Sequence, residues 1–164
     1  MCGIFAYIGN KYKYSQLLEN FIKTYRRGPD NCKLMNINNN LKFGFHRLMI
    51  NGLDSESDQP FHIKGCYLIC NGEIYNFEEL KIKFDIDDYE TKSDCEIIIH
   101  LYKQLGFEKM LHLLDGVFSF VLYDEEINEI FVARDPIGIR PLFINVGEDD
   151  FGFSSEAKSI IFME

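Results

Sequence analysis

The sequence has none of the features that mark a membrane protein or a secreted one. No window approaches the run of about 18 apolar residues that a membrane-spanning helix needs. The N-terminus lacks the basic stretch and long apolar run of a signal peptide, and no Asn-x-Ser/Thr glycosylation acceptor occurs. These absences favour a cytoplasmic protein.

Basic residues and phosphate-binding loops are also scarce. Lys and Arg number 17 against 26 Asp and Glu, a net charge of −9, whereas nucleic-acid binding needs clustered Lys and Arg. There is no Gly-x-x-x-x-Gly-Lys-Ser/Thr loop, no Gly-x-Gly-x-x-Gly turn and no Ser-Gly-Gly-x-Asp-Ser loop of the kind that holds pyrophosphate in adenylating synthetases. We therefore expect no nucleic-acid partner and no nucleotide cofactor in this domain.

The cysteines do not form the pattern of a disulfide framework. They are odd in number and irregularly spaced, at Cys2, Cys32, Cys66, Cys70 and Cys95. His62 lies just before Cys66 and Cys70, but these residues lack the paired spacing of a zinc site. We expect reduced thiols, no metal site and, since no Ser-His-Asp arrangement can be picked out, no such triad.

The length of 164 residues and the apolar share of 46% fit one domain with a core of its own. Apolar segments between turn residues predict strands at 4–8, 41–50, 67–70, 117–123, 130–134, 142–146 and 151–153. Helical spacing predicts helices at 14–25, 77–84, 95–105, 107–114 and 156–162. Short turns between strands imply antiparallel pairing, and grouped helices imply layers, so the predicted class is α+β.

Three local signals refine these elements. Ser15 is a candidate N-cap for the first helix, and Ser93 or Asp94 for the helix at 95–105. The dipeptide Asn71-Gly72 favours tight turns and is expected to end the strand at 67–70. Residues 51–60 are polar and turn-rich, and are predicted to form a loop.

Cys2 is the residue with the most chemical promise. A small residue after the initiator methionine permits removal of Met1, which would leave Cys2 with a free α-amine beside its thiol. That amine has a reference pKa of about 7.7–8.0, so it can accept the thiol proton and no separate histidine is needed. Taken alone, a cysteine at this position is more often without consequence.

Several short motifs accompany Cys2 in a fixed order. They are Cys2-Gly3-Ile4, Arg27-Gly28-Pro29-Asp30, His46-Arg47-Leu48, Asn71-Gly72-Glu73-Ile74-Tyr75-Asn76, Ser93-Asp94-Cys95-Glu96, Arg134-Asp135, Gly138, Pro141-Leu142-Phe143 and Ser154-Ser155-Glu156-Ala157-Lys158. In this order they resemble the N-terminal glutaminase domain of asparagine synthetases, a class II glutamine amidotransferase and N-terminal-nucleophile hydrolase. The resemblance covers the whole chain, residues 1–164.

The resemblance implies a role for each matching residue in hydrolysing the side-chain amide of glutamine. Cys2 corresponds to the nucleophile that forms a thioester and releases ammonia. The Asn71 side-chain amide and the Gly72 backbone N–H correspond to the donors that stabilise the oxyanion. Taken singly, Asn71-Gly72 is better explained as a hairpin turn.

The resemblance also implies how glutamine binds. Arg47 corresponds to the residue that holds the substrate carboxylate, and a guanidinium suits a bidentate grip. Asp94 corresponds to the residue that holds the ammonium, with Glu73 beside it. Each has an ordinary structural alternative, a strand-end charge for Arg47 and a helix cap for Asp94.

Two stretches of the chain depart from the family pattern. Arg26 stands where the family has a histidine before Arg-Gly-Pro-Asp. After Leu48, the segment Met49 to Gly52 intervenes where the family continues into an Ile/Val-Asp pair. Backbone contacts to glutamine from Leu48 and Ile50 are implied by the resemblance but fall in or beside this altered segment.

The resemblance implies a four-layer α/β/β/α sandwich of two antiparallel sheets. It further implies a partner that accepts the ammonia, namely a synthetase domain or subunit. ATP and Mg²⁺ are expected only in that synthetase part, for which this chain has no room. A homodimer is compatible with the resemblance. Two alternatives remain. Gly138-Ile139-Arg140-Pro141-Leu142 also resembles phosphoribosyl amidotransferases, and a non-catalytic glutamine-binding module would keep Arg47 and Asp94 with Cys2 blocked.

Overall fold

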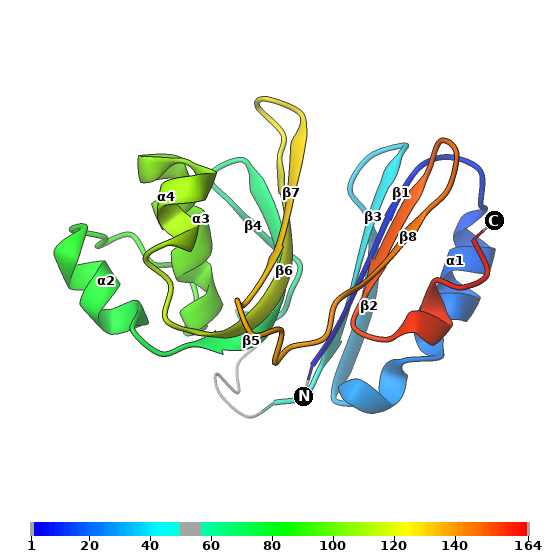
Figure 1. Ribbon diagram of the computed structural model, residues 1–164, viewed down its shortest axis with the longest axis horizontal. Helices are drawn as coiled ribbons and strands as arrows, with labels where there is room; N and C mark the ends of the chain where they lie inside the picture. The colour runs from blue at the N-terminus through cyan, green and yellow to red at the C-terminus, as the bar shows by residue number, and fades with distance from the viewer. Residues whose placement is uncertain (1, 50–56, 164) are drawn as a thin grey trace.

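The protein is built from two antiparallel sheets with helices on both outer sides. The computed structural model describes residues 2–49 and 57–163. In Figure 1 the helices α2–α4 cover one sheet, the second sheet stacks on the first, and α1 with the C-terminal segment covers the far side. The predicted α/β/β/α sandwich is therefore confirmed.

The strands are divided between the sheets as follows. The first, here called the β1 sheet, has the order β2-β3-β1-β9-β8, with bounds β1 Gly3–Ile8, β2 Asn31–Asn36, β3 Leu41–Arg47, β8 Phe143–Val146 and β9 Phe151–Ser154. The second, the β5 sheet, has the order β4-β5-β6-β7, with bounds β4 Phe61–Ile63, β5 Cys66–Ile74, β6 Gly116–Asp124 and β7 Glu129–Arg134.

The helices are short. The α-helices are α1 Tyr14–Ile22, α2 Phe77–Lys83, α3 Ile97–Leu105 and α4 Phe107–Leu111; 3₁₀ turns include η1 Tyr25–Arg27, η3 Asp94–Glu96 and η4 Ala157–Ser159. Gly106, with φ of +80°, ends α3 as the sequence predicts. Within the described residues no helix is long and apolar enough to cross a membrane.

Alternation along β1 explains why its sequence is apolar without interruption. Ile4 and Ala6 point into the space between the sheets, where they meet side chains such as Ile69 of β5. Phe5 and Tyr7 point the other way and pack against α1. Both faces of β1 are therefore buried, and a third core lies between the β5 sheet and α2–α4.

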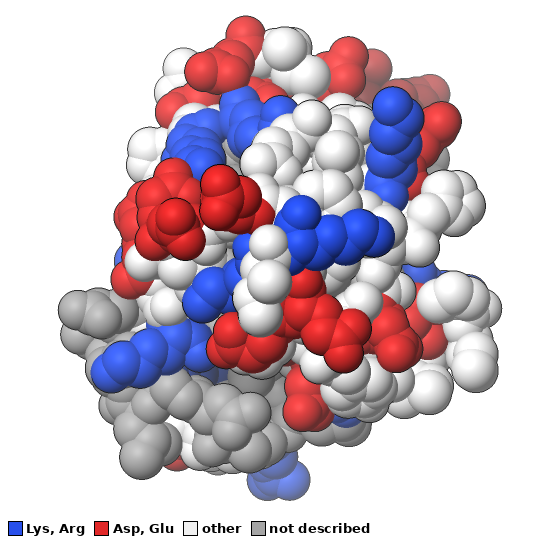
Figure 2. Space-filling model, turned by 90° about the vertical axis from the view of Figure 1, so that its left-hand side faces the viewer, with Lys and Arg blue, Asp and Glu red and all other residues white. Residues whose placement is uncertain are grey.

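The outer face over α2–α4 carries charges of both signs. Figure 2 shows acidic and basic side chains interspersed on this face, with no stripe of a single sign. Ion pairs such as Lys64–Asp88 at 2.8 Å and Lys103–Glu126 at 2.6 Å cross it. This face offers no basic surface for nucleic acid.

The prediction that a strand ends at Asn71-Gly72 is wrong. β5 continues to Ile74, and both residues pair with β6, Asn71 with Ser119 and Gly72 with Phe118. Pairing along the whole length of β6 outweighs the local turn preference of the dipeptide. Gly72 also satisfies a steric need, because a Cβ atom there would lie 2.5 Å from the Val117 carbonyl oxygen.

The helix predictions are wrong at several ends. The segment predicted as a helix at 156–162 contains only the single turn η4, and α1 ends at Ile22 rather than Tyr25. Lys13, not Ser15, is the N-cap of α1. α4 stops at Leu111, three residues before its predicted end.

Some strand predictions also need correction. Neither β2 nor β4 was predicted; β4 begins directly after the predicted loop at 51–60. β3 ends at Arg47, whereas the prediction ran on to Ile50, which lies outside the described residues.

Candidate active site

A cavity of about 130 Å³ opens at the end of the space between the two sheets. Residues from β1, β3, β5 and η3 converge there because β1 begins and β3 ends at the same edge, with Gly3 paired to His46. Seven of the predicted site residues line it: Cys2, Arg47, Leu48, Asn71, Gly72, Glu73 and Asp94. The eighth, Ile50, lies outside the described residues.

The Cys2 thiol is half-buried against the backbone of Leu48. The Leu48 N–H donates to Sγ at 3.4 Å, and Sγ lies 3.7 Å from the Leu48 carbonyl oxygen. Burial raises the pKa of this thiol, and the hydrogen bond from Leu48 lowers it only in part. Cys2 therefore stays a thiol in this environment until a base removes its proton.

The Asn71 side chain points into the space between the sheets. It lies on the same face of β5 as Ile69, whereas Leu68 and Cys70 face the helices. Its Nδ2 atom is buried and has no hydrogen-bond partner among residues 2–49 and 57–163. A buried donor without a partner costs about 1–3 kcal/mol, so its retention beside the thiol is a mark of function.

The backbone N–H of Gly72 is directed away from β6. Its cross-strand neighbour Phe118 donates its own N–H to the Asp135 carboxylate at 3.3 Å and accepts from the Asp135 N–H at 2.8 Å. Gly72 and Phe118 are thus a pair that exchanges no hydrogen bonds, and the polar groups of Gly72 face the other edge of β5.

β4 pairs with β5 only as far as Leu68. Beyond Leu68, side chains form the hydrogen bonds along this edge of β5. The Gln59 amide pairs with both backbone groups of Cys70, at 2.5 and 3.2 Å. The Asp94 carboxylate accepts from the Ile74 N–H at 2.5 Å. Between these two sites lies Gly72, which lines the cavity together with Asn71.

Two carboxylates, those of Glu73 and Asp94, form one part of the cavity wall. Ser93 caps η3 by accepting from the Cys95 N–H at 3.3 Å, which leaves the Asp94 side chain to the cavity. Burial raises the pKa of Asp94, and the nearby charge of Glu73 raises it further, against the hydrogen bond from Ile74. A cation bound here would relieve both effects.

Arg47 is the last residue of β3 and is buried, with 3% of its surface exposed. Its guanidinium pairs with Asp58, whose other oxygen accepts from the Asn31 amide at 2.7 Å. The cavity is therefore lined by a guanidinium from β3, carboxylates from β5 and η3, the Cys2 thiol, and the Asn71 amide, whose Nδ2 has no partner among the described residues.

Four residues of the site were not predicted. Asp58 orients Arg47, Gln59 replaces the missing β4 pairing, Asp135 holds Phe118, and Arg140 lines the cavity. Arg134-Asp135 and Arg140 were noticed as family motifs without a role. Asp58 and Gln59 lie in the segment predicted as a loop, and nothing in their spacing distinguishes them from other polar loop residues.

No group of three or more His, Cys, Asp or Glu side chains in the described parts of the chain could hold a metal ion. All five cysteines are free thiols.

The sequence matches the glutamine amidotransferase domain family over residues 1–164. It is 42% identical to the glutamine-hydrolysing asparagine synthetase of Gallus gallus and 41% identical to that of Homo sapiens, in each case over 98% of this chain and 29% of the relative. The chain thus spans under a third of the length of these relatives.

A solved structure supports the fold. Glutamine phosphoribosylpyrophosphate amidotransferase from B. subtilis, in complex with ADP and GMP, superposes with a TM-score of 0.81 at 22% identity, over 96% of this chain and 42% of that one. The fold, the match over the full chain and the site geometry agree: the chain belongs to the glutamine amidotransferase domain family.

Proposed function

We propose that this domain hydrolyses L-glutamine to glutamate and ammonia, as the glutaminase part of a glutamine-hydrolysing asparagine synthetase. One observation carries the proposal: the unpartnered Asn71 amide and the Gly72 N–H border the same cavity as the Cys2 thiol. The identity of 40–42% to asparagine synthetases favours this reading over a phosphoribosyl amidotransferase, whose likeness at 22% identity concerns the fold.

The reaction starts with removal of Met1, which frees the α-amine of Cys2. The neutral amine takes the proton from Sγ, directly or through water, and the thiolate attacks the amide carbon of glutamine. Burial holds the pKa of the thiol above its ordinary value, so a base next to it is required rather than optional.

The attack turns the amide oxygen into an oxyanion, which accepts hydrogen bonds from Asn71 Nδ2 and the Gly72 N–H. Collapse of this intermediate transfers the proton from the α-ammonium to the leaving nitrogen and releases ammonia. A water molecule then attacks the thioester through a second oxyanion. Glutamate leaves, and the thiol and the amine are restored.

Glutamine is held by its two charged ends. Arg47 binds the α-carboxylate, and Asp94 with Glu73 binds the α-ammonium. The backbone of Leu48 fixes Sγ and so positions the thiol against the side-chain amide; Ile50 belongs to the same substrate-binding segment. No metal or nucleotide takes part in these steps within this domain.

Ammonia needs an acceptor that this domain does not contain. Since the chain covers 29% of the length of its relatives, we place ATP, Mg²⁺ and the acceptor on a synthetase domain or subunit. We place the whole protein in the cytoplasm, where free thiols stay reduced.

The test is ammonia release from glutamine by the full-length protein. Mass spectrometry first establishes that Met1 is removed; a fully active protein that retains Met1 would refute the mechanism. Cys2→Ala should abolish hydrolysis, whereas Cys32→Ser, which changes a cysteine outside the cavity, should retain it. Binding of glutamine without hydrolysis, in protein lacking Met1, would instead indicate a regulatory module.

A further inference from the structure

Arg27 lies directly beside the nucleophile and holds its backbone. Its Nε donates to the Cys2 carbonyl oxygen at 2.8 Å, and 11% of its side chain is exposed. A Cβ atom at Gly3 would lie 3.2 Å from the Arg27 Cβ, so Gly3 leaves the room in which Arg27 approaches the start of β1.

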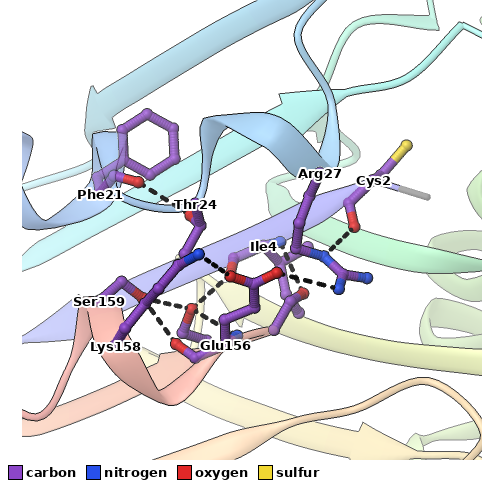
Figure 3. A network of polar contacts seen from close by, with 10 residues as sticks. Cys2, Ile4, Phe21, Thr24, Arg27, Glu156, Lys158 and Ser159 are labelled. Carbon is purple, nitrogen blue, oxygen red and sulfur yellow. Dashed lines mark hydrogen bonds and ion pairs between the residues drawn. The ribbon is translucent and has the colours of Figure 1, made fainter.

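Glu156, from the segment after β9, holds Arg27 from the other side. Its carboxylate lies 3.5 Å from Arg27 Nη1, and its second oxygen pairs with Lys158 at 2.6 Å. Figure 3 shows Glu156 placed between these two cations, with Arg27 reaching on to Cys2.

Glu156 is itself fixed relative to β1. Its N–H donates to Ser154 Oγ at 3.2 Å, and Ser154 Oγ also contacts the Ile4 carbonyl oxygen at 3.3 Å. The Ile4 N–H donates to Ser155 Oγ at 3.0 Å. The segment that carries Glu156 is therefore tied to the strand that begins at the nucleophile (Figure 3).

The charges of this network act on the α-amine of Cys2. A guanidinium beside an amine disfavours protonation of the amine and weakens it as a base, whereas a carboxylate behind the guanidinium offsets that effect. An uncompensated Arg27 would thus make the amine a poorer acceptor for the thiol proton at the moment of attack.

We propose that Glu156 is a positioning residue for glutamine hydrolysis, which holds Arg27 on the Cys2 carbonyl and offsets its charge so that the neighbouring α-amine remains an effective base. This inference rests on the proposed function. It makes the nucleophile depend on a residue more than 150 positions away in the sequence, in the segment that follows the last strand.

Glu156→Gln leaves the other charged side chains near Cys2 in place, and the further titratable group on which it acts is His46, because the charge of Glu156 opposes the lowering of the His46 pKa by burial and its removal makes the imidazole still more neutral. Arg47 from β3, Glu73 from β5, Asp94 from η3 and Arg140 from the turn after β7 line the cavity. His46 of β3 lies opposite Gly3, and burial lowers its pKa, so it is neutral at working pH. Lys158 stays on the far side of residue 156 from Arg27.

The experiment measures the pH dependence of glutamine hydrolysis by Glu156→Gln in the full-length protein lacking Met1. Activity rises with pH as the amine loses its proton, and we expect the midpoint of this rise to move down by about half a pH unit. At the plateau kcat should fall several-fold while the KM for glutamine stays nearly constant, because Arg47 and Asp94 are untouched. A merely structural role would lower activity without moving the midpoint.

Alkylation of Cys2 by iodoacetamide across the same pH range, followed by mass spectrometry, gives a readout without turnover. Its midpoint should move in the same direction, because loss of a negative charge also favours the thiolate. Glu129→Gln, at the far end of the β5 sheet from the cavity, removes one carboxylate as a matched control and should leave both midpoints in place.

A second pair of variants decides the matter if Glu156→Gln does not fold. Arg27→Gln should move the midpoints up, because it removes a positive charge beside the amine, and adding Glu156→Gln to it should lower kcat little further, since no Arg27 is left to be held. Unchanged midpoints in folded Glu156→Gln, unchanged midpoints in Arg27→Gln, or the same several-fold loss of kcat when Glu156→Gln is added to Arg27→Gln, would overturn the proposal. Absence of ammonia release by the unaltered protein would refute the proposed function instead, while the alkylation result would still stand.

Discussion

Gly72 and Phe118 face each other across β5 and β6 without exchanging a hydrogen bond, because Asp135 binds both backbone groups of Phe118. This relationship turns the Gly72 N–H toward the cavity. Residues on the far edge of the β5 sheet thus determine which way a donor of the active site points.

Gly72→Ala should therefore disrupt both the sheet and the reaction. The new methyl group would lie 2.5 Å from the Val117 carbonyl oxygen and 2.7 Å from the Phe118 Cα, both backbone atoms that cannot turn aside. We expect a loss of stability of about 1–3 kcal/mol by urea unfolding. Ammonia release should fall by about 10²–10³. An active Gly72→Ala protein would show that the close approach of β5 and β6 at this glycine is not needed to position its N–H.

Asn71→Leu should separate activity from stability. The buried Nδ2 donor has no partner among the described residues, and leucine fills a similar volume without a polar group. Hydrolysis should fall by about 10²–10³, as for loss of an oxyanion donor. The melting temperature should stay the same or rise. Asn76→Leu is the contrasting control, because Asn76 bonds to the Leu113 carbonyl and the Asp115 N–H, so its loss should lower the melting temperature.

Local sequence predicted the elements that are buried on both faces. Ile4 to Ile8 reads as a strand because both faces of β1 pack, and α3 ends at Gly106, whose positive φ suits glycine. The edge strand β2 escaped prediction because its polar residues carry no alternation, and it exists through pairing with β3. The C-terminal segment looks helical but forms only the turn η4, and the carbonyl oxygens of Ile160 and Met163 accept from the Asn145 amide of β8.

The site residues could be named from motifs, but their geometry could not. Asn71-Gly72 has the composition of a turn, and only its pairing with β6 makes it part of a strand. That pairing directs the Asn71 side chain into the space between the sheets and the Gly72 N–H toward the other edge of β5. Asp58 and Gln59 carry no pattern of their own. The role of Gln59 arises because β4 begins only at Phe61, which leaves the backbone of Cys70 for Gln59 to bond, and that of Asp58 arises from its contact with Arg47 of β3.

Glu96 should make the stability of the fold depend on pH. It is fully buried and accepts from the Glu90 and Thr91 N–H groups, each at 2.7 Å, and from His100 at 2.9 Å. Burial alone would raise its pKa, but these bonds outweigh burial and hold the pKa below the ordinary value. A lowered carboxyl pKa stabilises the fold above the unfolded value of about 4.3, and this stability is lost as the pH falls through the folded pKa.

The corresponding variant is Glu96→Gln. It should cost about 3 kcal/mol in urea unfolding at pH 7 and progressively less on acidification below about pH 4, where the unaltered protein loses the same contribution. Glu108→Gln, in the exposed first turn of α4, is the control and should cost little at either pH. An equal cost for Glu96→Gln at both pH values would mean that its charge contributes nothing.

Asp94 should set the pH dependence of glutamine binding. Burial and the charge of Glu73 raise its pKa above the ordinary value, so protonation begins at a higher pH than for an exposed carboxyl. Since only the ionised form attracts the substrate ammonium, KM should rise as the pH falls through this raised pKa, while kcat changes less. Asp94→Asn should raise KM at least tenfold, about 1.4 kcal/mol, and abolish this acid dependence. Asp115→Asn, an exposed carboxylate outside the cavity, should keep both the KM and its acid dependence; the same acid dependence in Asp94→Asn would assign it to another group.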